Sequence, residues 1–123
     1  MTEQELKDRA KQFAHRCVKL ALSLPETVLG KHIKGQLIRC STSVAANYRA
    51  TCLAQSPASF VSKISIVIEE CDESVFWLEF ITDAELIAKE RVSDLMKESD
   101  ELSRIFISSR KTVSDKLNKR QTK

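Results

Sequence analysis

The sequence predicts an all-α fold, in which four long helices form one antiparallel, up-down-up-down four-helix bundle. Only two glycines and two prolines occur in 123 residues, of which 42% are hydrophobic and 30% are charged. Few positions can therefore end a helix or form a tight turn. Apolar residues also recur at spacings of three and four, the period of a helix that buries one face. A chain of this length supports one hydrophobic core.

The first predicted helix covers residues 3–24. Its apolar stripe consists of Leu6, Ala10, Phe13, Cys17, Leu20 or Ala21, and Leu24. We expect Pro25 to end this helix, because proline disfavours helical geometry in the preceding residue and cannot donate a backbone hydrogen bond. A short turn through Gly30 is expected to follow.

The second predicted helix covers residues 30–54. Its apolar stripe consists of Ile33, Leu37, Cys40 or Ser41, Val44, Ala45, Tyr48 and Cys52. The small residues of segment 41–46 predict close approach of a neighbouring helix. Gly35 costs roughly 1 kcal/mol of helix stability relative to alanine, so we expect a close contact or a local irregularity there.

The third helix is predicted to start at Ser56 and Pro57, because serine is a good N-cap and proline is favoured at the first helical position. Its stripe consists of Phe60, Ile64, Val67, Cys71, Ser74 or Val75, Leu78, and Ile81 or Thr82. Further apolar residues widen this surface: Val61, Ile68, Phe76, Trp77 and Phe80. A single bundle cannot cover all of them, so this helix predicts an oligomer.

The helical period breaks at residues 86–88, and a fourth helix is predicted over 89–114. Its inward residues are Leu95, Leu102, Ile105, Phe106 and Ser109. We therefore expect a bundle domain of residues 1–114 and a basic, disordered tail at 115–123. Short loops between helices of this length favour the antiparallel topology.

The net charge of +3 conceals a segregation of charge along the chain. Residues 27–68 contain five basic residues and no acidic residue, whereas residues 69–101 contain twelve acidic residues against three basic ones. Residues 102–123 contain seven basic residues and one acidic residue. Such blocks indicate complementary packing between helices or subunits, a surface that binds a polyanion, or both.

The N-terminal segment 1–13 lacks the apolar core of a secretory signal, and no apolar run approaches the roughly 20 residues that span a bilayer. We expect a cytoplasmic protein with no membrane span. The four cysteines are Cys17, Cys40, Cys52 and Cys71. Their wide spacing does not predict a zinc site, and we expect reduced thiols buried on the apolar faces.

Catalytic patterns are not found in the sequence. His15 and His32 are the only histidines, and neither has an evident nucleophile partner. The acidic run 69–73, with Glu79, lacks the E-x-x-H pairs of a di-iron bundle. Phosphate-binding loops and hydrolase motifs are also absent from the sequence. We expect no enzymatic activity, no cofactor and no metal.

Binding of a polyanion is the remaining chemical hypothesis. The candidate phosphate-binding residues are Lys31, Lys34, Arg39 and Arg49 on the second helix, and Arg110, Lys111, Lys116, Lys119, Arg120 and Lys123 near the C-terminus. Alternatively, Arg39 and Arg49 form ion pairs with acidic residues of the third helix or of an adjacent subunit. Tyr48 and Trp77 are expected in the core or an interface rather than stacked on bases.

Three segments resemble one protein family. They are residues 35–50 (GQLIRCSTSVAANYRA), residues 24–27 (LPET), and the pattern Phe60-x-x-Lys63-x-Ser65-x-x-x-Glu69-Glu70-x-x-Glu73-x-x-x-Trp77-Leu78. They are similar to the bacterial four helix bundle proteins, also called the intervening-sequence protein family because some members are encoded within insertions in large-subunit ribosomal RNA genes. The resemblance covers about residues 5–114.

The resemblance implies an antiparallel four-helix bundle that assembles into a homopentamer. Related accessory proteins of diversity-generating retroelements bind nucleic acid together with a reverse transcriptase. The residues that match the family motif are Arg39, Ser43, Asn47 and Arg49, with Glu70 and Glu73 on the third helix. Residues 48–51 differ from the Glu-Gly pair that is frequent in the family at this place.

These observations lead to three hypotheses. The first is a non-enzymatic homo-oligomer that binds RNA or DNA, structured RNA in particular, through basic residues of the second helix and the tail. The second is a scaffold, or a module that binds a protein partner, in which the charges serve assembly alone. The third and weakest is an enzyme that depends on metal or on thiols.

Overall fold

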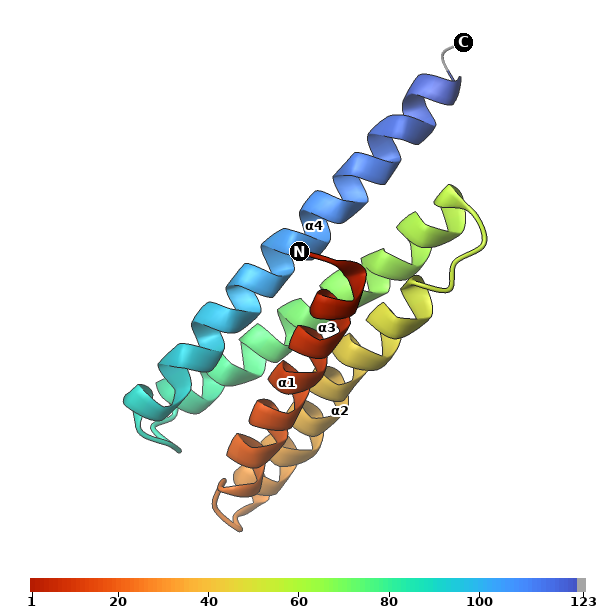
Figure 1. Ribbon diagram of the computed structural model, residues 1–123. Coiled ribbons are helices and arrows are strands. Elements are labelled where there is room, and N and C mark those ends of the chain that lie inside the picture. The colour runs from red at the N-terminus through yellow and green to blue at the C-terminus, as the bar shows by residue number, and fades with distance from the viewer. Residues whose placement is uncertain (122–123) are drawn as a thin grey trace.

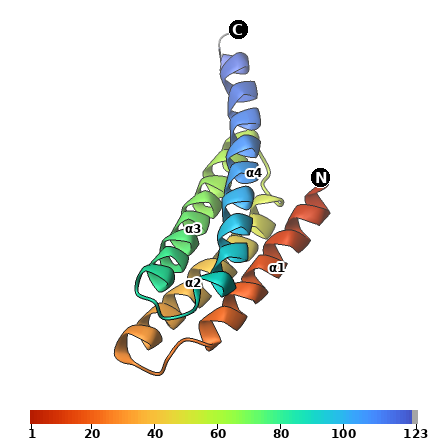
Figure 2. The ribbon, with the colours of Figure 1, turned by 90° about the vertical axis from the view of Figure 1, so that its left-hand side faces the viewer.

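The computed structural model describes residues 1–121 and contains four α-helices in that part of the chain. They are α1 (Glu3–Leu22), α2 (Val28–Thr51), α3 (Pro57–Asp83) and α4 (Lys89–Gln121). The helices alternate in direction along the chain (Figures 1 and 2). The predicted all-α, four-helix fold is therefore confirmed. None of these helices has both the length and the apolar character that crossing a membrane requires, over residues 1–121.

Side-chain caps determine where three of the helices begin. The hydroxyl oxygens of Thr2, Thr27 and Ser56 accept hydrogen bonds from the backbone amides three residues later, at 3.0–3.1 Å. Each bond satisfies one of the amide groups that the first turn of a helix leaves without a partner. The start of α3 at Pro57 agrees with the sequence prediction, whereas α2 spans 28–51 rather than 30–54.

The core consists of the apolar stripes of all four helices. Fully buried large side chains include Phe13 from α1, Leu37 from α2, Leu78 from α3 and Phe106 from α4. Neighbouring helices in the sequence pack extensively on one another, and the contact between α1 and α4 is the smallest. The α1/α4 seam is therefore the most open side of the bundle.

Helix α4 is longer than the sequence analysis predicted. It continues as helix to Gln121, whereas the prediction ended it at 114 and assigned a disordered tail to 115–123. The physical reason is that Val113 and Leu117 continue the apolar face of Phe106 at the helical period and are half-buried, beside a recess that Phe60 and the loop between α2 and α3 also line. Residues 122–123 of the predicted tail lie outside the described part of the chain.

The two glycines differ from the sequence-based expectation. Gly30 lies within the first turn of α2, not in a turn between helices, and is buried against Pro25. Gly35 is exposed, and an added Cβ there would meet nothing within 4 Å. The close contact predicted at Gly35 therefore occurs at Gly30, because the chain between α1 and α2 folds back over the start of α2.

Candidate nucleic-acid interface

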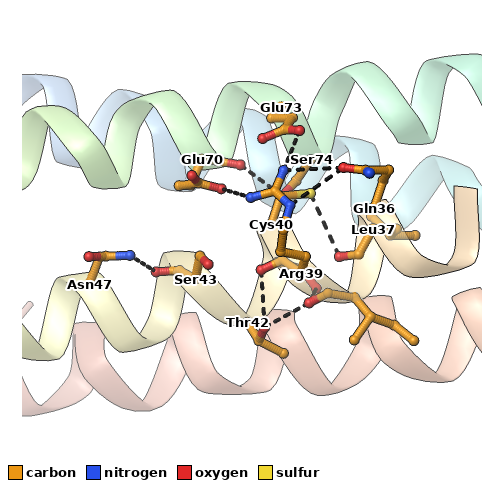
Figure 3. Close-up of polar contacts among 12 residues, drawn as sticks. Gln36, Leu37, Arg39, Cys40, Thr42, Ser43, Asn47, Glu70, Glu73 and Ser74 are labelled. Atoms are coloured by element: carbon orange, nitrogen blue, oxygen red, sulfur yellow. Dashed lines mark hydrogen bonds and ion pairs between the residues drawn. The ribbon is translucent and has the colours of Figure 1, made fainter.

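Arg39 lies between α2 and α3 and contacts two carboxylates (Figure 3). Its Nη1 lies 3.2 Å from Oε2 of Glu70, and its Nη2 donates to Oε1 of Glu73. The hydrogen bond to Glu73 raises the pKa of Arg39, so the guanidinium stays charged. The ion-pair alternative for Arg39 is therefore realised within the subunit, although 47% of the side chain remains exposed.

Small side chains beneath Arg39 hold α2 close to α3. The hydroxyl of the buried Ser74 lies 3.3 Å from Sγ of the buried Cys40 and 2.9 Å from the carbonyl oxygen of Glu70. Two small side chains that meet in this way let the helix backbones approach closely. The long side chain of Arg39 then spans the outside of the seam and reaches both acids (Figure 3).

The other family-motif residues are placed differently. Nδ2 of Asn47 donates to the carbonyl oxygen of Ser43 at 2.9 Å, so this pair interacts within α2 (Figure 3). Arg49 makes no ion pair within residues 1–121 and does not contact Glu70 or Glu73. The structure thus brings Arg39, Glu70 and Glu73 together but places Arg49 elsewhere on α2.

Lys31 and Lys34 share the carboxylate of Glu26. The Nζ atom of Lys34 lies 2.6 Å from one oxygen of Glu26, and that of Lys31 lies 3.9 Å from the other. The sequence analysis considered residues 27–68 as a block without acids, and Glu26 lies just outside that block. The folded chain reduces the positive charge at the start of α2 because the preceding loop brings this acid back over the helix.

Arg49 instead lines a groove between α1 and α2. The groove has a volume of about 700 Å³, and Lys7, Lys11 and His15 of α1 also line it. Sequence reasoning did not select these α1 residues. They are four residues apart, which places their side chains on one face of a helix, and this spacing could have indicated a common surface.

The end of α4 carries the remaining candidate cations. Nη1 of Arg110 donates to the hydroxyl of Ser65 at 3.3 Å, which attaches this residue to α3. Lys111 is exposed, and neither it nor Lys116 makes an ion pair within residues 1–121. Lys116 and Arg120 line a recess of about 450 Å³ beside the loop between α2 and α3. Figure 1 shows these turns of α4 projecting past the other helices.

The thiols lie in environments that oppose nucleophilic reaction at neutral pH. Cys17, Cys40 and Cys71 are fully buried, and Cys52 is half-buried. Burial raises the pKa of all four thiols, that of Cys71 to about 12. Only the thiolate is strongly nucleophilic, so this environment opposes thiol chemistry.

The histidines and acids form no evident reactive centre. His15 is exposed, and the ring of His32 packs edge-on against Trp77 at a centroid distance of 5.5 Å. In the part of the chain that the structure describes, no three histidine, cysteine or acidic side chains are arranged to hold a metal ion.

Comparison with known proteins places these features in a family. The model of the 23S rRNA-intervening sequence protein family matches residues 2–108. A crystal structure of a protein of unknown function from the S23 ribosomal protein family of Bacteroides thetaiotaomicron is similar, with a TM-score of 0.79 and 34% sequence identity. The alignment covers 86% of this chain and 98% of that one.

No functionally curated protein matches the chain. Neither the family nor the related structure is described by a catalytic activity. The family match includes α1, α2, α3 and most of α4, and it confirms the resemblance seen in the sequence. The chain is a member of the 23S rRNA-intervening sequence protein family.

Proposed function

We propose that this protein is a non-enzymatic, cytoplasmic homo-oligomer that binds nucleic acid, structured RNA in particular, through the C-terminal turns of α4. The observation that carries the proposal is the basic, projecting end of this helix. Residues 110–120 contain five basic residues and one acidic residue on a helix that extends past the rest of the bundle (Figure 2). The homopentameric state is proposed from the family resemblance.

The cations of α4 are better placed for phosphates than those of α2. Lys34 and Arg39 already contact carboxylates of the same subunit, so a phosphate must compete with Glu26, Glu70 or Glu73 for them. Lys111 and Lys116 have no such competitor within residues 1–121. Lysines that are not neutralised by the protein attract the phosphate backbone and release its counterions, without selecting a sequence.

A second candidate function is a scaffold or a module for a protein partner. The specific observation in its favour is the exposed aromatic surface of α3, where Phe76 is 51% exposed and Phe80 is 38% exposed. Exposed aromatic residues in a cluster are characteristic of interaction surfaces. In this alternative the basic end of α4 has no nucleic-acid ligand.

Fluorescence anisotropy separates the two functions. A labelled structured RNA and a duplex DNA are titrated with the protein at low and at physiological salt. The test variant is Lys111→Gln/Lys116→Gln, and the matched control is Lys31→Gln/Lys34→Gln, which removes two lysines that contact Glu26.

The nucleic-acid function predicts binding that survives physiological salt and weakens at least tenfold in the α4 variant but not in the control. A similar loss in both variants would mean that binding follows the overall positive charge and not the end of α4, and no loss in either would place the contact surface elsewhere. No binding at low salt, where phosphate attraction is strongest, would leave the scaffold function.

A further inference from the structure

The groove between α1 and α2 is basic and lined with small side chains. Its lining residues are Gln4, Lys7, Asp8, Lys11, Ala14, His15 and Val18 from α1, and Thr42, Ala45, Ala46 and Arg49 from α2. Three alanines and one threonine leave space between the helices, which gives the groove its volume of about 700 Å³. The groove can therefore accept bulky side chains from outside.

The charges of the groove are largely unneutralised. Lys11 and Arg49 make no ion pair within residues 1–121, and Lys7 makes a long, exposed contact of 3.7 Å with Glu3. The carboxylate of Asp8 accepts a hydrogen bond from Gln4 at 3.0 Å and is the one acidic group in the lining. The groove thus presents a net positive charge to its occupant.

The outward face of α3 has the opposite character. Exposed residues recur there at spacings of three and four, and we call this face the α3 ridge: Glu69, Asp72, Phe76, Glu79, Phe80 and Asp83. Phe76 and Phe80 stack obliquely with a centroid distance of 6.1 Å, and both pack on Trp77. None of the four acids of the ridge makes an ion pair within the described chain.

The ridge and the groove of one subunit cannot meet each other. Helix α2 packs on both α1 and α3, whereas the backbones of α1 and α3 do not approach each other within residues 1–121. The α1 side of the groove extends from residue 4 to residue 18, and the ridge from residue 69 to residue 83. At 1.5 Å per residue each is roughly 21 Å long, so the lengths match as well as the charges.

We infer that the α1/α2 groove of one subunit receives the α3 ridge of a second copy of the chain. This inference rests on the proposed homo-oligomeric state and names the two surfaces that form it. Phe76 and Phe80 enter the space above Ala45 and Ala46, while the acids of the ridge lie beside Lys7, Lys11 and Arg49. Rigid aromatic side chains buried in a pocket supply most of the affinity of many interfaces, and surrounding charges fix the orientation.

Such a contact joins two different surfaces, so in a pair of subunits one keeps an unused ridge and the other keeps an unused groove. A heterologous contact of this kind closes into a ring or continues as a chain. The surfaces involved are separate from the basic end of α4, so assembly and nucleic-acid binding can be altered independently.

Sedimentation velocity tests the inference with charge reversals on each surface. The groove variant is Lys11→Glu/Arg49→Glu, and the ridge variant is Asp72→Lys/Glu79→Lys. Each is expected to sediment as a monomer at concentrations where the unmodified protein is an oligomer. The control is Lys97→Glu/Arg104→Glu, which reverses two exposed cations of α4 and is expected to leave the mass unchanged. Circular dichroism verifies that each variant is folded.

Two combinations make the test specific to this pair of surfaces. A mixture of the groove and ridge variants is expected to associate although each alone is monomeric, because the intact groove pairs with the intact ridge and the reversed groove pairs with the reversed ridge. The chain that carries all four substitutions is expected to recover the oligomer, because reversed grooves then face reversed ridges. Phe76→Ala, which leaves every charge in place, is expected to raise the dissociation constant at least tenfold.

The inference is overturned if the unmodified protein is a monomer at 100 μM, or if the fourfold variant stays monomeric while folded. It is also overturned if the mixture yields no complex. The Lys111→Gln/Lys116→Gln variant distinguishes this failure from failure of the nucleic-acid function, since it is expected to lose RNA affinity at unchanged mass.

Discussion

The two glycines offer a matched test of packing at the level of single residues. A Cβ on Gly30 would lie 1.9 Å from the carbonyl oxygen of Pro25, whereas a Cβ on Gly35 would meet nothing within 4 Å. We expect Gly30→Ala to lower the free energy of unfolding by about 1–3 kcal/mol, because backbone must move to admit the methyl group. Gly35→Ala is expected to raise it by about 0.5–1 kcal/mol, because alanine is the better helix former.

Urea unfolding followed by circular dichroism measures both changes. Each glycine serves as the control for the other, because both lie in α2 and receive the same methyl group. A stabilising Gly30→Ala, or equal effects at the two positions, would contradict the packing seen at the start of α2.

The four cysteines also differ in how far their side chains are exposed to solvent. Cys17, Cys40 and Cys71 are 0% exposed, whereas Cys52 is half-buried near the end of α2. We expect a disulfide reagent at neutral pH to modify Cys52 slowly and to modify the other three thiols only when the protein unfolds. Colorimetric thiol counting with and without denaturant, using Cys52→Ala as the control, measures this. Fast modification of any thiol in that variant would contradict the buried positions.

At the level of elements, one arginine connects α1 to two acids of α4 across the α1/α4 seam. Nε and Nη2 of Arg9 on α1 donate to the two carboxylate oxygens of Glu98 on α4 at 2.9 and 2.6 Å, and Nη2 also contacts Glu101 at 2.9 Å. Both side chains of the main pair are mostly buried. Because these two helices have the smallest contact in the bundle, we expect the pair to contribute to how firmly they are joined.

We expect Arg9→Ala to lower the free energy of unfolding by about 1–2 kcal/mol, since it leaves Glu98 partly buried without its bidentate partner. Arg104→Ala is the matched control, because Arg104 forms an exposed ion pair with Asp100 on its own helix, and a loss of about 0.5 kcal/mol or less is expected. Urea unfolding and a double-mutant cycle with Glu98→Ala check the prediction. A coupling energy near zero would contradict it.

The sequence predicted the elements better than it predicted their ends. The start at Pro57 was predictable because serine and proline mark it locally. The continuation of α4 to Gln121 was missed because Val113 and Leu117 are separated by charged residues, and only the fold shows that both are half-buried and line one recess with Phe60. For Arg39 the sequence left two alternatives open, phosphate binding and ion pairing with acids such as Glu70 and Glu73. Sequence spacing does not fix which faces of two helices meet, so it could not decide between them.

At the level of the whole molecule, the blocks of charge are only partly neutralised by folding. Ion pairs join Arg9, Lys34 and Arg39 to acids on other segments of the chain. They neutralise part of the acidic block and some of the cations of α2. The remainder is separated in space, with positive charge at the groove and at the end of α4, and negative charge on the α3 ridge. The sequence identified the cations of α2 and α4, but not the groove residues of α1, since the groove exists only once α1 packs on α2.

The buried thiols make the stability of the whole molecule depend on pH at the alkaline end. The folded-state pKa of Cys71 is about 12 against an ordinary 9.0, and burial also raises the pKa of Cys17 and of Tyr48. A raised pKa means that the folded state holds its proton more tightly. The resulting stability is fully present below about pH 9 and is lost as the pH rises toward 12.

We therefore expect the free energy of unfolding to fall by about 1.4 kcal/mol per pH unit for each such group, above pH 9.0 for the thiols and above pH 10.0 for Tyr48. Urea unfolding in reducing buffer between pH 8 and 11 measures the slope. Cys71→Ala is expected to make the slope shallower by the contribution of one group, whatever the substitution does to the free energy of unfolding at pH 8. An unchanged slope in this variant would contradict the assignment to Cys71.

The salt dependence of RNA affinity tests the proposed role of α4 at the scale of the assembled protein. Each lysine that neutralises a phosphate contributes about 0.7 to the slope of log affinity against log salt for a single strand, and about 0.9 for a duplex. We expect Lys111→Gln/Lys116→Gln to reduce this slope by about 1.4 to 1.8, because two phosphate contacts are lost. The Lys31→Gln/Lys34→Gln control is expected to keep the slope of the unmodified protein, because both lysines contact Glu26. Equal slopes in all three proteins would mean that the α4 lysines do not contact phosphates, even where affinity itself has changed.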